Sequence, residues 1–136
     1  MGNRRDHDCF AIGDLSRLTG VNVETIRYYE RMRLMPRPPR TQGGHRAFGP
    51  DDLRTLVFIK RARELDFRLD DIRALLSLRG AERACNDVKV IASRHLASVR
   101  TKMRHLVELE RTLADAVARC PGDKTDACTV LEILEA

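Results

Sequence analysis

The sequence predicts a mainly α-helical protein, with a winged helix-turn-helix domain, a further helical pair, and a long helix suited to antiparallel coiled-coil dimerisation. Three observations support this fold class. Two short amphipathic segments meet at a glycine-containing turn, a basic Pro- and Gly-rich stretch follows, and residues 86–119 form an amphipathic run without Pro or Gly. We expect four parts: 10–80, the winged helix-turn-helix with the helical pair that follows it; 81–84, a hinge; 85–119, the long helix; and 120–136, a loop with a short helix.

The first two segments predict a helix-turn-helix. Apolar side chains recur at helical spacing over residues 12–18, and Gly20 follows the end of this helix. Asn22 is a good N-cap for the second helix, with Glu24 in its first turn, and the pattern continues to about Arg33. On or near the outer face of this second helix lie Thr25, Arg27 and Tyr28. The second helix of a helix-turn-helix enters the major groove of DNA. The alternative interpretation of these two segments is an ordinary helical hairpin that binds no DNA.

A basic hairpin is predicted next. Pro36, Pro38 and Pro39 prevent the helix from continuing, and Gly43-Gly44 suits a tight turn. A basic hairpin directly after a recognition helix is a wing, which contacts the DNA backbone or the minor groove. The predicted phosphate contacts in this wing are Arg37, Arg40 and Arg46.

Two further helices are expected before the hinge. Pro50 opens the first, which continues through Leu65, and Leu69 opens the second, which closes by Gly80. Two cations of the first helix, Lys60 and Arg63, are candidates for a second contact with the DNA backbone. A solvated basic face is the commoner explanation for such a pair.

The long helix separates three cysteines. About 34 residues at about 1.5 Å each span on the order of 50 Å, so Cys85 lies at one end, and Cys120 with Cys128 at the other. Within one chain, Cys85 cannot share a ligand with the other two. Two such helices paired antiparallel place Cys85 of one chain beside Cys120 and Cys128 of its partner, which predicts two identical three-thiol pockets per homodimer.

Composition narrows the class of protein. The 25 Lys and Arg outnumber the 20 Asp and Glu, and the resulting charge of +5 suits a nucleic-acid partner. No apolar window is long enough to span a membrane and the N-terminus is polar, so we expect a cytoplasmic protein with reduced thiols. An enzyme is not expected, because the sequence offers no base–nucleophile pair and no phosphate-binding glycine loop.

Three blocks resemble the MerR family of metal-responsive transcription regulators: "IGDLSRLTGVNVETIRYYERMRLMPRPPR", "HRAFGPDDLRTLVFIKRARELDFRLDDIRALLSL" and "CPGDKTDACTVLEIL". The resemblance implies the fold described above and DNA contacts by Arg27, Tyr28 and Arg46. It also implies a homodimer on a promoter with an over-long spacer, where bound metal distorts the DNA so that RNA polymerase engages. Two positions depart from the family pattern, Phe48 in place of Tyr and Asp66 in place of Gly; Asp tolerates a left-handed backbone better than most residues.

Three thiolates indicate a soft metal ion. They suit Hg(II), Pb(II), or Cd(II) with an added oxygen, whereas Zn(II) needs a fourth ligand such as Asp123, Asp126 or water. In the family resembled, divalent sensors have Cys at the position of Cys85, while copper, silver and gold sensors have Ser. The Cys120–Cys128 loop looks more like the copper type, but Cys85 adds a third thiolate and its negative charge, which would over-ligate a linear Cu(I) site. We therefore expect a divalent ion bound by Cys85, Cys120 and Cys128.

Several alternatives stay open. One is a Cu(I), Ag(I) or Au(I) sensor that uses Cys120 and Cys128 only. Another is a thiol redox switch in which these two cysteines form a disulfide, and a third is a metal carrier that binds no DNA. Cys9 is expected to be a spare thiol, and His95 and His105 to be solvated surface residues.

Overall fold

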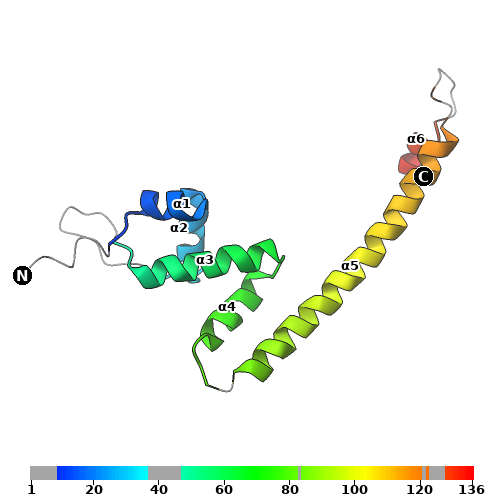
Figure 1. Cartoon of the computed structure of the whole chain (residues 1–136). Coiled ribbons are helices and arrows are strands. Elements are labelled where there is room, and N and C mark those ends of the chain that lie inside the picture. Colours follow the sequence, from blue (N-terminus) through cyan, green and yellow to red (C-terminus); the bar gives the residue numbers. More distant parts are fainter. Residues whose placement is uncertain (1–8, 37–46, 83, 121, 123–127) are drawn as a thin grey trace, which may run out of the picture. The chain divides into compact units, whose positions relative to one another are not determined.

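The computed structural model describes residues 9–36, 47–82, 84–120, 122 and 128–136. These residues belong to two compact units, an N-terminal unit, Met1–Val88, and a C-terminal unit, Lys89–Ala136. The described part of the chain contains six helices and no strand, which confirms the mainly α-helical fold class (Figure 1). The predicted wing falls within residues 37–46 and lies outside the described ranges.

Four helices form the body of the N-terminal unit. They are α1 (Ile12–Thr19), α2 (Val23–Arg31), α3 (Pro50–Glu64) and α4 (Leu69–Leu78). Helix α1 packs against α2 and α3, and α3 packs against α4. Their apolar faces enclose one core, whose buried members are Leu15, Ile26, Tyr29, Leu34, Met35, Phe48, Leu56, Ile59, Ala62 and Ile72.

The turn between α1 and α2 forms the helix-turn-helix. Gly20 ends α1 with a left-handed φ of 75°, and its N–H donates to the Ser16 carbonyl at 2.8 Å. Asn22 caps α2, because its Oδ1 accepts the Glu24 N–H at 2.8 Å. Both signals were visible in the sequence, and the structure confirms them.

Helices α3 and α4 begin as the sequence indicates. Pro50 occupies the first turn of α3, and the Asp52 carboxylate accepts the Gly49 N–H at 2.8 Å. Asp66, between α3 and α4, has a φ of 63°, the left-handed conformation expected where a Gly is usual. Phe48 is bridged to Phe10 by two backbone hydrogen bonds of 2.7 and 2.8 Å, and its ring is fully buried, so this position serves packing in the core.

Two helices account for most of the remaining described residues. Helix α5 spans Cys85–Arg119, the same bounds that the sequence predicts, and α6 spans Thr129–Glu135. Gly80, between α4 and α5, has a left-handed φ of 79°. None of the helices in the described ranges combines the length and apolarity needed to cross a bilayer.

Candidate nucleic-acid interface and metal centre

The outer face of α2 carries the side chains predicted to read DNA. Arg27 and Tyr28 are exposed and Thr25 is half-buried, whereas Ile26 and Tyr29 face the core. The Arg27 guanidinium donates to Glu24 Oε1 at 3.0 Å. This alternation leaves a polar and aromatic surface on the side of the helix away from the core.

Arg31 extends this surface, and sequence reasoning missed it. Its guanidinium carbon lies 6.0 Å from the centre of the Tyr28 ring, within the range of a cation–π contact. Arg31 follows Tyr28 by three positions and Arg27 by four, so helical spacing alone could have placed it on the same face.

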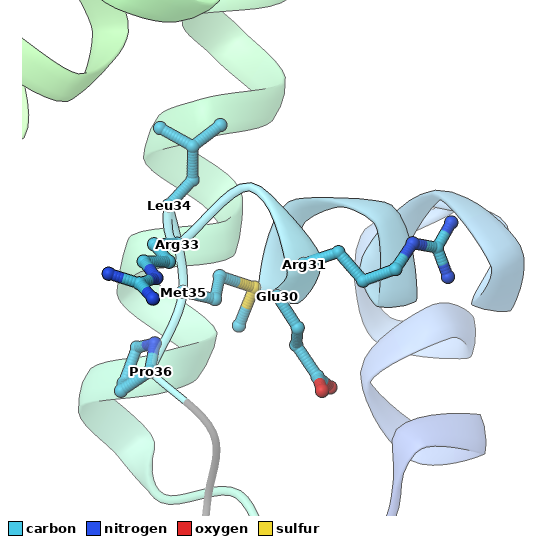
Figure 2. Close-up of a pocket in the computed structure, with 6 residues that line it drawn as sticks. All are labelled: Glu30, Arg31, Arg33, Leu34, Met35 and Pro36. Atoms are coloured by element: carbon cyan, nitrogen blue, oxygen red, sulfur yellow. The ribbon is translucent and has the colours of Figure 1, made fainter.

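The turn after α2 encloses a hollow of about 740 Å³ lined by Glu30, Arg31, Arg33, Leu34, Met35 and Pro36. Figure 2 shows the Arg31 and Arg33 guanidinium groups pointing to opposite sides, while Met35 points back towards α2. Arg33 has a left-handed φ of 58°, and the Leu34 N–H donates to the Tyr29 carbonyl at 2.9 Å. The turn thus buries Leu34 and Met35 in the core and leaves Arg33 exposed.

The two predicted phosphate contacts on α3 both have partners within the N-terminal unit. Lys60 Nζ donates to the Thr19 carbonyl at 2.6 Å and lies 4.0 Å from Glu64 Oε1. Arg63 Nη1 donates to the Phe67 carbonyl at 2.8 Å. The remaining predicted phosphate contacts, Arg37, Arg40 and Arg46, lie outside the described residues.

The candidate metal ligands lie at the ends of helices. Cys85 is the first residue of α5, Cys120 directly follows its last residue, and Cys128 is the N-cap of α6. All are free thiols; Cys85 is exposed, while Cys120 and Cys128 are half-buried. Helix α5 is uninterrupted over 35 residues, so about 50 Å of helix separates Cys85 from Cys120. Asp123 and Asp126, proposed as oxygen ligands, lie outside the described ranges.

An apolar seam follows α5 between these ends. Its side chains recur at steps of three and four residues, which brings them to one side of the helix. Five of them are 47–66% exposed in the single chain: Leu96, Met103, Leu106, Leu113 and Val117. Cys85 and Cys120 continue the same spacing at the two ends of the helix.

Two family models match the sequence. One, described as MerR HTH family regulatory protein, matches residues 10–78. The other, described as MerR, DNA binding, matches residues 53–116. Together they extend from the start of the helix-turn-helix to near the end of α5.

Similar proteins match over nearly their full length. A heavy metal-dependent transcription regulator of Rhizobium meliloti is 38% identical over 122 residues, which cover 89% of this chain and 83% of that protein. The regulator PbrR691 from Ralstonia metallidurans, whose structure is known in complex with lead(II), is 39% identical in sequence to this chain. Their structures superpose with a TM-score of 0.77 over 92% of this chain and 98% of that one. The regulator MerR from Bacillus megaterium, in complex with mercury(II), is 35% identical, with a TM-score of 0.68, covering 93% and 100%.

Proposed function

Because the chain belongs to the MerR family of transcription regulators, we propose that it is a metal-responsive regulator that binds promoter DNA as a homodimer. A divalent soft ion, Hg(II), Pb(II), Cd(II) or Zn(II), binds Cys85 of one chain together with Cys120 and Cys128 of the other. The metal-bound dimer activates genes for metal export or detoxification. As a regulator of promoters, it acts in the cytoplasm.

The observation that carries the proposal is the arrangement of α5. One uninterrupted helix has a thiol at each end, and between them an apolar seam that the single chain leaves exposed. Burying the five exposed side chains of the seam against a second copy stabilises the pair by several kcal/mol in total, at about 25 cal/mol per Å² of apolar surface. An antiparallel pair buries these side chains and places the first end of each α5 beside the last end of its partner. The same contact therefore forms the dimer and brings the three thiols together.

The donor set supports a soft divalent ion. Thiolates bind such ions in preference to Mg(II) or Ca(II), and three of them satisfy the low coordination numbers of Hg(II) and Pb(II). Two similar regulators are known as complexes with lead(II) and with mercury(II). These three cysteines are the ligands that this chain itself would supply.

The reading of DNA is assigned to α2 and its surroundings. Arg27 and Tyr28, with Thr25 beside them, face away from the core on the helix that enters the groove. The predicted wing supplies phosphate contacts through Arg37, Arg40 and Arg46, and on α3 Arg63 is a candidate for a further one. Lys60, predicted from its charge to make another, donates to the Thr19 carbonyl instead. RNA polymerase engages the promoter once the metal-bound dimer distorts the DNA.

The hinge between α4 and α5 couples the two activities. Gly80 has the backbone freedom to change the direction of the chain there, and the residue before it, Arg79, bonds Thr55 Oγ1 at 3.0 Å. The metal acts by its differential affinity for two arrangements of the dimer, one of which distorts the DNA.

Competitive titration of the reduced protein with Hg(II), Pb(II), Cd(II), Zn(II) and Cu(I) tests the proposal. Ultraviolet thiolate-to-metal bands count the thiolates bound, in wild type and in the Cys85→Ser, Cys120→Ser and Cys128→Ser variants. We expect one divalent ion per pocket and loss of tight binding in each variant. Cys9→Ser is the matched control, and it should bind like wild type.

A DNA-binding assay with and without metal completes the test. Cys120→Ser and Cys128→Ser should keep metal-free DNA affinity and lose the metal-induced distortion. Equal loss of both activities would assign these cysteines a structural role instead. Tight Cu(I) binding that is indifferent to Cys85 would favour the monovalent sensor, and peroxide-driven oxidation with no metal effect would favour a redox switch.

A further inference from the structure

The last carbonyls of both helices in the helix-turn-helix are bound by cations from the two helices that follow. Lys60 of α3 donates from Nζ to the carbonyl of Thr19, the last residue of α1, at 2.6 Å. Arg73 of α4 donates from Nη2 to the carbonyl of Met32, the C-cap of α2, at 2.5 Å. In each pair the two residues are 41 positions apart.

These contacts satisfy groups that the helices cannot satisfy themselves. The carbonyls of the last helical turn have no partner within the helix, and they form the negative end of its dipole. A cation placed there is favourable, and a hydrogen bond to a charged donor is stronger than a neutral one. Each cation therefore fastens the end of one helix to another helix.

Both cations are also held by their own helices. Arg73 Nη1 donates to Asp70 Oδ1 at 3.0 Å while Nη2 reaches Met32, so the planar guanidinium bridges α4 and the end of α2. Lys60 lies 4.0 Å from Glu64, and a Cβ at Gly20 would be 3.5 Å from its Nζ. The ammonium group thus lies directly against the turn between α1 and α2.

Helix α4 is itself fastened to α3. Arg79 Nη2 donates to Thr55 Oγ1 at 3.0 Å, and its guanidinium carbon lies 5.7 Å from the centre of the Phe58 ring. Thr55 is buried, which makes this contact part of the interior of the helical pair. Helices α3 and α4 consequently form a frame with one cation directed at each helix of the helix-turn-helix.

We propose that Lys60 and Arg73 are positioning residues, which hold α1 and α2 at the angle at which α2 reads the bases of DNA. This inference rests on the proposed role of α2 as the reading helix. It assigns Lys60 a different role from the phosphate contact that its charge alone suggests. Loss of Arg73 releases the end of α2, and loss of Lys60 releases the end of α1, against which α2 packs. In either case α2 is held less firmly and discriminates less well between base sequences.

The salt dependence of DNA binding separates the two roles. A phosphate contact contributes about 1 to the slope of log K against log salt, whatever the base sequence. A positioning residue changes the affinity for the preferred sequence and leaves the slope in place. The DNA used is a duplex selected in vitro for tight binding to the wild-type homodimer, together with a scrambled duplex of the same composition.

Lys60→Gln and Arg73→Gln remove each cation while keeping a side chain of comparable length. We expect each variant to bind the selected duplex about tenfold more weakly, because a charged hydrogen bond to the reading unit is lost. Binding to the scrambled duplex should stay within about twofold, and the salt slope should remain that of wild type. Arg73→Lys, which keeps the charge without the planar bridge, should recover part of the discrimination.

Arg54→Gln is the matched control. Arg54 lies on α3, its ion pair is with Asp51 in the same helix, and its removal changes the net charge equally. We expect it to behave like wild type on both duplexes. All assays are made well below the unfolding temperature of each variant, so that global unfolding does not contribute.

Two outcomes would overturn the inference. A salt slope reduced by about 1, with equal losses on both duplexes, would make the residue a phosphate contact. Unchanged discrimination in both Gln variants would show that the contacts do not position α2. Failure of the proposed function looks different, since a wild-type protein that reads no DNA would yield no selected duplex at all.

Discussion

The two units of the chain use similar apolar residues in opposite ways. In the N-terminal unit, Leu15, Leu56 and Ile72 are fully buried, and short helices meet around them from several directions. In the C-terminal unit, Met103, Leu106 and Val117 are 61–66% exposed along a single long helix. The first unit has a core of its own, whereas in the described part of the second only Ile91 and Ala116 are buried and most large apolar side chains are exposed.

The difference shows where stability comes from in each unit. A core formed within one chain stabilises it at any protein concentration. A seam on an isolated helix contributes only when another surface covers it, so its contribution depends on concentration. The proposed dimer therefore predicts that substitutions in the two units differ in kind as well as in size.

The largest expected effect comes from a charge in the seam. Leu106→Glu removes a buried Leu from both chains of the proposed dimer, at about 2 kcal/mol or more for each. The dimer dissociation constant should rise by about a thousandfold or more. Sedimentation over a range of protein concentrations measures it.

Thr101→Glu is the control for this substitution. Thr101 lies on the side of α5 away from the seam and is exposed, so the same acidic side chain should leave the dimer intact there. Equal dissociation by both variants would mean that added negative charge on α5, rather than the seam, controls association.

A core substitution should have an effect of similar or smaller size, and this effect should be independent of protein concentration. Leu56→Ala removes a fully buried side chain of α3 and leaves a cavity, which costs about 2–5 kcal/mol in the free energy of unfolding. Urea unfolding at two protein concentrations, followed by a probe in the N-terminal unit, should give the same loss at both. A loss that grows on dilution would show that this core also depends on the second copy.

A glycine at a left-handed position should stabilise the N-terminal unit. Arg33 has a φ of 58° and an exposed side chain, so Arg33→Gly removes backbone strain and should raise the free energy of unfolding by about 1 kcal/mol. Asp66→Gly, at a φ of 63°, should gain less, because Asp adopts this conformation more readily. Thermal unfolding compares the two, and an equal or larger gain at Asp66 would contradict this account.

Local signals in the sequence predict most of the helices. Asn22, Pro50 and the acidic first turns of α3 and α4 act on backbone groups within four positions, and the structure shows each helix beginning beside them. The positions of the cysteines follow in the same way from the length of α5. The pairing of Cys85 with Cys120 and Cys128 stays a prediction, because it depends on how two copies meet.

Contacts between distant residues were not predictable in this way. Helical periodicity places Lys60 and Arg73 on polar faces, but nothing near either residue in the sequence indicates Thr19 or Met32 as its partner. The conformation of Arg33 was missed for a related reason. An arginine carries no signal for a left-handed backbone, and the burial of Leu34 and Met35 against the core requires the turn.

The expected effect that is smallest at neutral pH is a pH dependence of stability confined to the N-terminal unit. Both tyrosines of the chain, Tyr28 and Tyr29, lie in α2, so tyrosinate absorbance reports on this unit alone. Burial raises the pKa of Tyr29 above its ordinary value of 10.0, because ionisation would place a charge in the core. In the unfolded chain the same hydroxyl ionises near pH 10, which favours unfolding above that pH.

The contribution of Tyr29 is therefore fully present below pH 10 and decreases as the pH rises towards the folded-state pKa. The decrease is at most about 1.4 kcal/mol per pH unit. Tyr29→Phe removes this titration, so its unfolding free energy should parallel that of wild type from pH 7 to 9 and fall less steeply above pH 10. Urea unfolding across this range measures both curves. Curves that stay parallel to pH 11 would mean that Tyr29 ionises as readily in the folded unit as in the unfolded chain. The core around α2 would then admit water, and in this respect it would resemble the exposed seam of α5.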